Sequence, residues 1–231
     1  MRVYDYIIAG AGAAGLQLSY FMRTDSFFDA KKILVLENVR KNKNDRTWCF
    51  WEKEPGPFED ILHKSWKSAL FASNYFSNSI DLKPYTYKML RGIDVYKKVL
   101  STLEEHPSFD VRYETAQDIK DNDTNVSVIT EKEQYKASKV FSSIFNPEKM
   151  FAQKKHPVLQ QHFIGWFVKT TNAVFNPEEV TFMDFQVPQL GNTRFMYVLP
   201  FSENEALVEY TLFSEKLLPK EAYENAIKRY L

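Results

Sequence analysis

The sequence predicts an α/β fold in which a Rossmann-like nucleotide-binding domain is joined to a substrate domain built on an antiparallel β-sheet. The first 37 residues follow a strand–helix–strand order, with a glycine-rich turn at the first junction. After residue 155 the pattern changes to strand-like segments separated by short turns. A chain of 231 residues is long enough for two such domains.

The nucleotide-binding domain is expected to span residues 1–155. Its opening elements are a strand, a helix and a second buried strand, at residues 3–10, 13–23 and 31–37. An amphipathic helix and three short strands are expected at residues 92–107, 109–114, 126–130 and 139–145. Between them lies an aromatic-rich insertion near residues 45–90, where a polar and then aromatic loop is followed by an irregular stretch.

The substrate domain is expected at residues 156–215, where segments rich in β-branched and aromatic residues alternate with turns such as PQLGNT and SENE. The four expected strands are residues 163–170, 179–185, 194–201 and 206–213. A helix is expected to begin within residues 216–231, because Pro219 would stand near its first turn, where proline is favoured.

Composition narrows the class of protein. Thirty basic and thirty acidic residues cancel, so no overall field favours nucleic acid. The single cysteine, Cys49, excludes an intrachain disulfide and suits a reducing compartment. No apolar run reaches the length of roughly 18 residues needed to span a bilayer, and the four histidines lack metal-ligand spacing. A cytoplasmic protein with no metal is therefore expected.

Gly10, Gly12 and Gly15 form a G-x-G-x-x-G motif between the first strand and the first helix. In that place backbone amides at the helix N-terminus can hold a pyrophosphate. Glu37 ends the next strand, where an acid would bind ribose hydroxyls. The motif predicts a dinucleotide, FAD or NAD(P). The long loop after Glu37 and the later antiparallel sheet favour FAD, because a plain NAD domain would continue with regular βαβ units.

Glu209 is the unusual residue of the second domain, because it stands inside the apolar segment ALVEYTLF. A carboxylate in a strand covered on both faces is costly unless it is paired or neutral. Two interpretations remain open at this point. Glu209 lies on an edge strand in water, or the protein uses an acid in an apolar place.

The aromatic residues of TWCFW leave a similar choice. Trp48, Phe50 and Trp51 either line a slot for a flat apolar ligand or belong to the core. Trp166 and Phe163 of the later FIGWFV segment are expected in the core, and Cys49 is expected to be a small buried hydrophobe.

With these segments in view, the chain resembles the lycopene cyclases, flavoproteins that close β-rings on carotenoids. The G-x-G-x-x-G motif, DRTWCFW (45–51), LQQHFIGWFVKT (159–170) and FMDFQVPQLGNTRFMYVLPFSENEALVEYT (182–211) carry the resemblance. They lie in the order found in that family and cover about a third of the chain. TWCFW and the two paired strands of the last segment are much more specific than the glycine motif.

The resemblance implies that Glu209 is the essential acid of an E-x-T segment, completed here by Tyr210 and Thr211. It also implies that Arg46 and Thr47 of DRTWCFW join the cofactor-binding residues. FAD would act in its reduced form and NAD(P)H would supply the reduction. Ser142 and Ser143 stand where the family carries an acid, so no role is transferred to that position.

The implied reaction is the acid-catalysed closure of lycopene end groups to β-ionone rings, an isomerisation without net redox change. An alkene is a poor base, so the acid must be protonated and shielded from water. Burial in an apolar strand raises a carboxyl pKa, and a rise of about two to three units would keep much of Glu209 protonated near neutral pH. The costly position would thus make Glu209 a usable proton donor.

Two other functions remain open. One is a different flavoprotein of the same architecture, an aromatic hydroxylase or an isoprenoid reductase, and the other is a non-catalytic nucleotide-binding fragment. The last glycine is Gly191, whereas flavoproteins of this architecture carry a later glycine-bearing segment, so an N-terminal portion of a longer protein is expected. Because lycopene resides in lipid, we expect peripheral contact with the inner face of the membrane, with the basic RKNKNDR stretch (40–46) as weak support.

Overall fold

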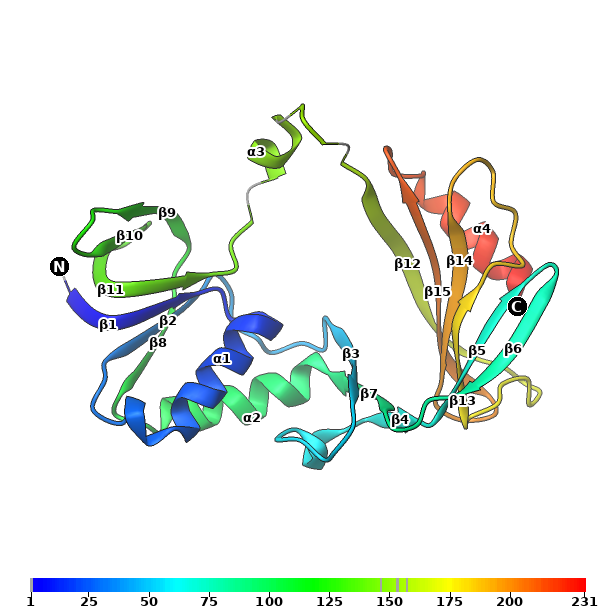
Figure 1. Ribbon diagram of the computed structural model, residues 1–231, viewed down its shortest axis with the longest axis horizontal. Helices are drawn as coiled ribbons and strands as arrows, with labels where there is room; N and C mark the ends of the chain where they lie inside the picture. The colour runs from blue at the N-terminus through cyan, green and yellow to red at the C-terminus, as the bar shows by residue number, and fades with distance from the viewer. Residues whose placement is uncertain (1, 146, 153, 157) are drawn as a thin grey trace. The chain divides into compact units, whose positions relative to one another are not determined.

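The computed structural model describes residues 2–145, 147–152, 154–156 and 158–231, and the chain divides into two compact units (Figure 1). The first unit comprises residues 1–48 and 90–146, and the second comprises residues 49–89 and 147–231. Each unit is therefore built from two separate stretches of chain. No helix among the described residues has the length and apolar character needed to cross a bilayer.

The first unit is a six-stranded sheet with two helices, in the strand order β8-β2-β1-β11-β10-β9. Parallel pairing joins its first four strands, β8 (Phe109–Tyr113), β2 (Ile33–Glu37), β1 (Arg2–Ala9) and β11 (Gln134–Ser142). Antiparallel pairing adds β10 (Val126–Thr130) and β9 (Ala116–Asp121). The two helices, α1 (Ala13–Thr24) and α2 (Gly92–Glu104), pack on each other, and a 3-10 turn, η1 (Ser26–Phe28), follows α1.

The buried strands of this unit match their apolar sequences. Every residue of β2 is buried, and Ile7, Leu34, Leu36 and Tyr135 form the centre of its core. A strand covered on both faces must be apolar throughout, which explains the continuous run in KKILVLE. The Rossmann-like α/β prediction is confirmed, while β9 was not predicted because its alternation of polar residues resembles a loop.

The second unit contains a six-stranded sheet in the order β12-β15-β14-β13-β5-β6. Its strands are β12 (Gln160–Lys169), β15 (Glu205–Ser214), β14 (Arg194–Pro200), β13 (Glu179–Asp184), β5 (Ser68–Ser73) and β6 (Phe76–Asp81). The antiparallel prediction holds for β12, β15, β14 and β13, but β5 pairs with β13 in parallel. The sheet is therefore mixed, which a prediction from residues 156–215 alone could not include.

A smaller, three-stranded sheet has the strand order β3-β7-β4. It consists of β3 (Thr47–Glu52), β7 (Thr86–Arg91) and β4 (Lys64–Trp66), with a 3-10 turn, η2 (Glu59–Ile61), between β3 and β4. The ammonium group of Lys88 bonds the carboxylates of Glu52 (2.8 Å) and Glu59 (2.5 Å) and so ties β7 to β3 and η2.

The structure changes the predicted division of the chain. Residues 45–90 were expected as a largely irregular insertion in the first domain, whereas they contain β3 to β7 and residues 49–89 belong to the second unit. The pairing of β5 with β13 accounts for this difference, since it adds the segment to a sheet formed by the second half of the chain. The two remaining helices are α3 (Pro147–Ala152) and α4 (Lys220–Tyr230).

The two faces of the larger sheet bury different sets of residues. On one face Val208, Tyr210 and Leu212 of β15 pack against Tyr223 and Ile227 of α4. The helix lies along the sheet in Figure 1. On the other face a second apolar cluster gathers Leu207 and Leu199 with residues of the smaller sheet, among them Trp66, Tyr87 and Met89. Strand alternation assigns Glu209 to this second face, with Leu207 and Thr211.

Candidate functional site

The glycine motif forms a tight turn between β1 and α1. Gly10 has a φ of +104°, a conformation that side chains other than glycine rarely adopt, and a Cβ atom there would overlap the hydroxyl of Ser143. A Cβ atom on Gly15 would overlap the carbonyl oxygen of Gly10. Gly12 has open space around the position of a Cβ atom. Thus Gly10 and Gly15 are required by the turn itself, and Gly12 leaves a space beside it.

The N-terminus of α1 fits a phosphate group. Gly12 caps the helix without a side-chain hydrogen bond, and the first turn carries no acidic residue. The first amides of a helix lack intrahelical acceptors and lie at the positive end of its dipole. They are therefore suited to binding an anion such as a pyrophosphate.

Glu37 lies next to this turn and is fixed by three contacts. Its Oε2 atom accepts a hydrogen bond from the amide of Ala11 (2.9 Å), and Oε1 accepts one from the amide of Asn38 (2.9 Å). Lys41 places its ammonium nitrogen 3.4 Å from Oε1. A carboxylate has about four acceptor sites, so Glu37 keeps capacity for ribose hydroxyls.

A pocket of about 220 Å³ brings Gly10, Gly12 and Glu37 together, with Ser143 and Thr115 also in its wall. Arg46 and Thr47 are not among its lining residues. The carbonyl of Arg46 accepts a hydrogen bond from the amide of Gly92 (2.8 Å), and Thr47 begins β3. Gly10, Gly12 and Glu37 thus line one pocket, and their role in binding a nucleotide, like that of Arg46 and Thr47, stays a prediction.

We expect Gly15→Ala to destabilise the protein by about 1–3 kcal/mol, because the added methyl group meets backbone atoms that cannot move aside. Gly12→Ala is the matched control, since its φ of −79° and open surroundings accept a methyl group. Urea unfolding of both variants measures the difference. Equal stability of the two variants would contradict the close packing of α1 on β1.

Glu209 lies near the middle of β15, an interior strand of the larger sheet that pairs with β12 and β14. In the register of β15 it faces Tyr197 of β14 on one side and Gly165 of β12 on the other. Its carboxyl group is half-buried, and no described residue donates a hydrogen bond to it. Burial raises the pKa of Glu209 from 4.5 to about 7. The edge-strand interpretation is thus not what the structure shows.

A pair of tyrosines lies close to Glu209, and the sequence did not single them out. The hydroxyl oxygens of Tyr87 and Tyr197 are 2.6 Å apart, and Tyr197 is the cross-strand neighbour of Glu209. Burial raises the pKa of both phenols, and for Tyr87 the charge of Glu209 contributes as well. Burial also raises the pKa of the nearby Cys49 thiol, which fits a neutral, inert cysteine.

Aromatic rings extend from this tyrosine pair. Trp51 lies 4.4 Å from Tyr87 and 5.5 Å from Phe182, measured between ring centroids, and Phe182 in turn contacts Tyr197. Trp51 is 44% exposed, so it offers a ring face at the surface of this cluster. Trp48 instead packs edge-on against Tyr96. Of the TWCFW aromatics, Trp51 is therefore the one that the structure brings to the apolar group beside Glu209.

Two other expectations are decided by burial. Trp166 packs partly buried against the core on the α4 face of the sheet. Phe163 was predicted in the core, but it is 54% exposed, because β12 is an edge strand and its Glu209-facing side has no covering layer within the described part of the unit. Among the described residues no group of three metal-ligating side chains is found.

Gly165 makes room for the Glu209 side chain. A Cβ atom on Gly165 would lie 2.9 Å from Cγ and 3.1 Å from Oε1 of Glu209. We expect Gly165→Ala to turn the carboxyl group out of its place, lowering the activity that depends on it by up to about 100-fold. The pH midpoint of that activity should fall towards the usual carboxyl range, because the displaced group gains water. A loss of activity with an unchanged midpoint would argue against a positioning role for Gly165.

The fold has many solved counterparts at low sequence identity. A geranylgeranyl bacteriochlorophyll reductase-like protein from Thermoplasma acidophilum is 13% identical, with a TM-score of 0.67 over the whole of this chain. The halogenase PltM, solved with phloroglucinol and FAD, is 13% identical (TM-score 0.65, 99% of this chain). The p-nitrophenol 4-monooxygenase PnpA from Pseudomonas putida DLL-E4 is 12% identical (TM-score 0.62, 97% of this chain).

This chain spans 62%, 55% and 61% of the length of those three proteins. At such identities the similarity establishes the fold alone. No curated protein sequence matches the chain.

A sequence family described as lycopene cyclase protein matches residues 5–231, which is nearly the whole chain. The match includes the glycine turn, the TWCFW strand and the strand that carries Glu209. The chain belongs to the lycopene cyclase family.

Proposed function

We propose that the protein acts in lycopene β-cyclisation, closing the end groups of lycopene to β-ionone rings, with Glu209 as the proton donor. The observation that carries this proposal is the Glu209 carboxyl group, half-buried between Gly165 and Tyr197, with a pKa raised to about 7 by burial. An acid of that pKa is about half protonated near neutral pH, which keeps a large population able to donate a proton. Membership in the lycopene cyclase family supports the choice of substrate.

The proposed reaction has three steps. Glu209 would add a proton to the terminal double bond, a neighbouring double bond would attack the resulting cation to close the ring, and the ring cation would return a proton to the Glu209 carboxylate. Atoms and electrons balance, so the product is an isomer. The rings of Trp51, Tyr87 and Phe182 would exclude water that could quench the cation, and their faces attract positive charge.

The cofactor proposed for this activity is FAD in its reduced form, with NAD(P)H as the source of the reduction. When bound, the reduced flavin would stabilise the cationic transition state electrostatically. Gly10, Gly12 and the first amides of α1 would hold its pyrophosphate, and Glu37 its ribose. The open space at Gly12 and the uncapped helix fit this group. Arg46 and Thr47 are proposed as further contacts.

The substrate also implies a location. Lycopene resides in lipid, so the protein is proposed to work in the cytoplasm at the inner face of the membrane, as a peripheral protein. The stretch 40–46, RKNKNDR, carries four basic residues that would contact anionic headgroups. Pelleting with vesicles of anionic lipid and with vesicles of neutral lipid tests this contact. The protein is expected to bind the anionic vesicles more strongly at low salt.

A second candidate is a redox flavoprotein, favoured by the reductase-like, halogenase and monooxygenase folds among the solved counterparts. The two candidates differ in their use of NAD(P)H. A redox enzyme consumes one NAD(P)H for each product formed, whereas a cyclase needs NAD(P)H only to reduce the flavin once. Measuring NAD(P)H oxidised per molecule of product separates them.

Carotenoid chromatography from a lycopene-accumulating host that expresses this chain tests the proposal directly. New cyclic carotenoids would establish cyclisation. Unchanged lycopene in a host that contains the folded, flavin-loaded protein would overturn the proposal for this chain. A folded protein that never takes up flavin would instead support the non-catalytic alternative.

A further inference from the structure

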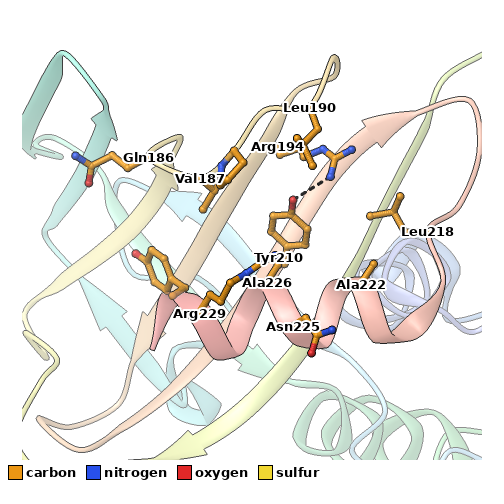
Figure 2. A pocket seen from close by; sticks show the side chains of 12 residues that line it. Gln186, Val187, Leu190, Arg194, Tyr210, Leu218, Ala222, Asn225, Ala226 and Arg229 are labelled. Atoms are coloured by element: carbon orange, nitrogen blue, oxygen red, sulfur yellow. Dashed lines mark hydrogen bonds between the residues drawn. The ribbon is translucent and has the colours of Figure 1, made fainter.

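A second pocket lies on the opposite face of the larger sheet from Glu209. It has a volume of about 380 Å³ and is bounded by α4, by β14 and β15, and by the loop that precedes β14 (Figure 2). Tyr210 lines it, and Tyr210 is next to Glu209 in β15, so strand alternation directs the two side chains to opposite faces. The pocket is thus separate from the group proposed to donate the proton.

Two guanidinium groups line this pocket and no carboxylate does. Figure 2 shows Arg194 entering it from β14 and Arg229 from α4. Arg194 is 7% exposed. Its side chain donates to the hydroxyl of Tyr210 (3.2 Å) and to the side-chain oxygen of Asn192 (2.6 Å), both neutral acceptors. Throughout the described ranges, no acid comes within 4.0 Å of either guanidinium group.

The nearby buried acid is already engaged elsewhere. The carboxylate of Asp184 accepts hydrogen bonds from the hydroxyl of Tyr230 (2.9 Å) and from the amide of Gln186 (2.9 Å), and it forms no ion pair with any described residue. The positive charge of Arg194 also affects His162. Burial lowers the pKa of His162, and the charge of Arg194 lowers it further. A buried charge normally has a counter-charge. Here the described part of the chain supplies none.

The rest of the pocket is suited to a small amphiphile. Leu190, Leu218, Ala222 and Ala226 form apolar walls, and Asn225 adds an amide from α4. The wall formed by the preceding loop is firmly braced, because the side-chain amide of Gln189 donates to three backbone carbonyls, those of residues 185, 187 and 194. A braced, mostly apolar pocket with a few convergent polar groups is typical of a ligand site.

We propose that this pocket binds a small amphiphilic oxyanion, a carboxylate or phosphate ester with a short apolar body. Arg194 and Arg229 bind the oxyanion, and the apolar walls contact the body. Guanidinium groups match planar carboxylates and phosphates with paired hydrogen bonds. The same chemistry occurs in soluble acids and in the headgroups of anionic lipids, which the probes distinguish.

Calorimetric titration of the 231-residue protein with hexyl phosphate tests the proposal. Saturable binding is expected, and Arg229→Gln should weaken it about tenfold, the loss of one charge-assisted hydrogen bond. Lys228→Gln is the matched control, because Lys228 is the adjacent basic residue of α4, does not line the pocket and lies over the ring of Trp166 instead. It should change the affinity less than about twofold.

Further arms decide the chemistry. Hexanol should not bind measurably, and vesicles that contain an anionic phospholipid should compete with hexyl phosphate if the headgroup is the natural source. Absence of competition leaves a soluble oxyanion as the source. No saturable binding at millimolar concentration, equal binding of hexanol, or equal losses in Arg229→Gln and Lys228→Gln would overturn the proposal. Arg194→Lys, which keeps the buried charge, is titrated in the same way as Arg229→Gln. Thermal unfolding confirms that both variants fold.

Discussion

Glu209→Gln is expected to abolish detectable ring formation in a lycopene-accumulating host, with a loss of about 100- to 10,000-fold in rate. Glutamine has nearly the same size but cannot donate a proton to an alkene. The variant should fold, because the glutamine side chain occupies the space beside Gly165 that the glutamate fills. Chromatography of the carotenoids measures the effect, with the amount of folded protein determined in parallel.

Glu205→Gln is the matched control for this variant. Glu205 lies on the same strand and the same face, but it is paired with Lys169 at the surface (2.8 Å). Its removal should leave cyclisation within about twofold, because exposed ion pairs contribute little. Ring formation that survives Glu209→Gln, or that is lost equally in Glu205→Gln, would rule out Glu209 as the proton donor.

Glu209 is also expected to make the stability of the protein depend on pH. Its pKa is raised from 4.5 to about 7 in the folded state, so the folded protein holds a proton that the unfolded chain releases. The stabilisation is complete below about pH 4.5 and is lost as the pH rises through about 7. Since the group is half-buried, we expect the loss to be about 2–3 kcal/mol in the free energy of unfolding.

The measurement is the difference in unfolding free energy between the wild type and Glu209→Gln across this pH range. Other titrating groups are common to both proteins and cancel in the difference. The wild type should lose stability relative to the variant as the pH rises. A constant difference would mean that Glu209 titrates near its ordinary pKa, and the argument for a neutral acid would fail.

The parts of the site that follow from local sequence were open to prediction. The glycine turn needs particular backbone conformations at Gly10 and Gly15, and only a short stretch of chain fixes them. The position of Glu37 was predictable because it ends β2, which pairs in parallel with β1 and therefore ends beside the turn that follows β1. The unusual chemistry of Glu209 was visible because a carboxylate stands out in an apolar strand.

The parts that depend on pairing between distant strands could not be predicted. Gly165 and Tyr197 become neighbours of Glu209 only through the registers of β12 and β14 with β15. The parallel pairing of β5 with β13 joins residues about 110 positions apart, and no local pattern encodes it. The same limit hid the pocket of Arg194 and Arg229, whose walls come from two strands, two loops and a helix.

The division of each unit between two stretches of chain has a consequence for synthesis and for engineering. The contact between Ala9, at the end of β1, and Ser143, directly after β11, spans 134 residues, and the contact between Ser68 of β5 and Glu178, directly before β13, spans 110. At ribosomal rates each strand keeps one open edge for roughly 10 s, long enough for pairing with another nascent chain. No single cut can release either unit intact. A polypeptide that comprises the second unit alone must join residues 49–89 to residues 147–231 through a new linker.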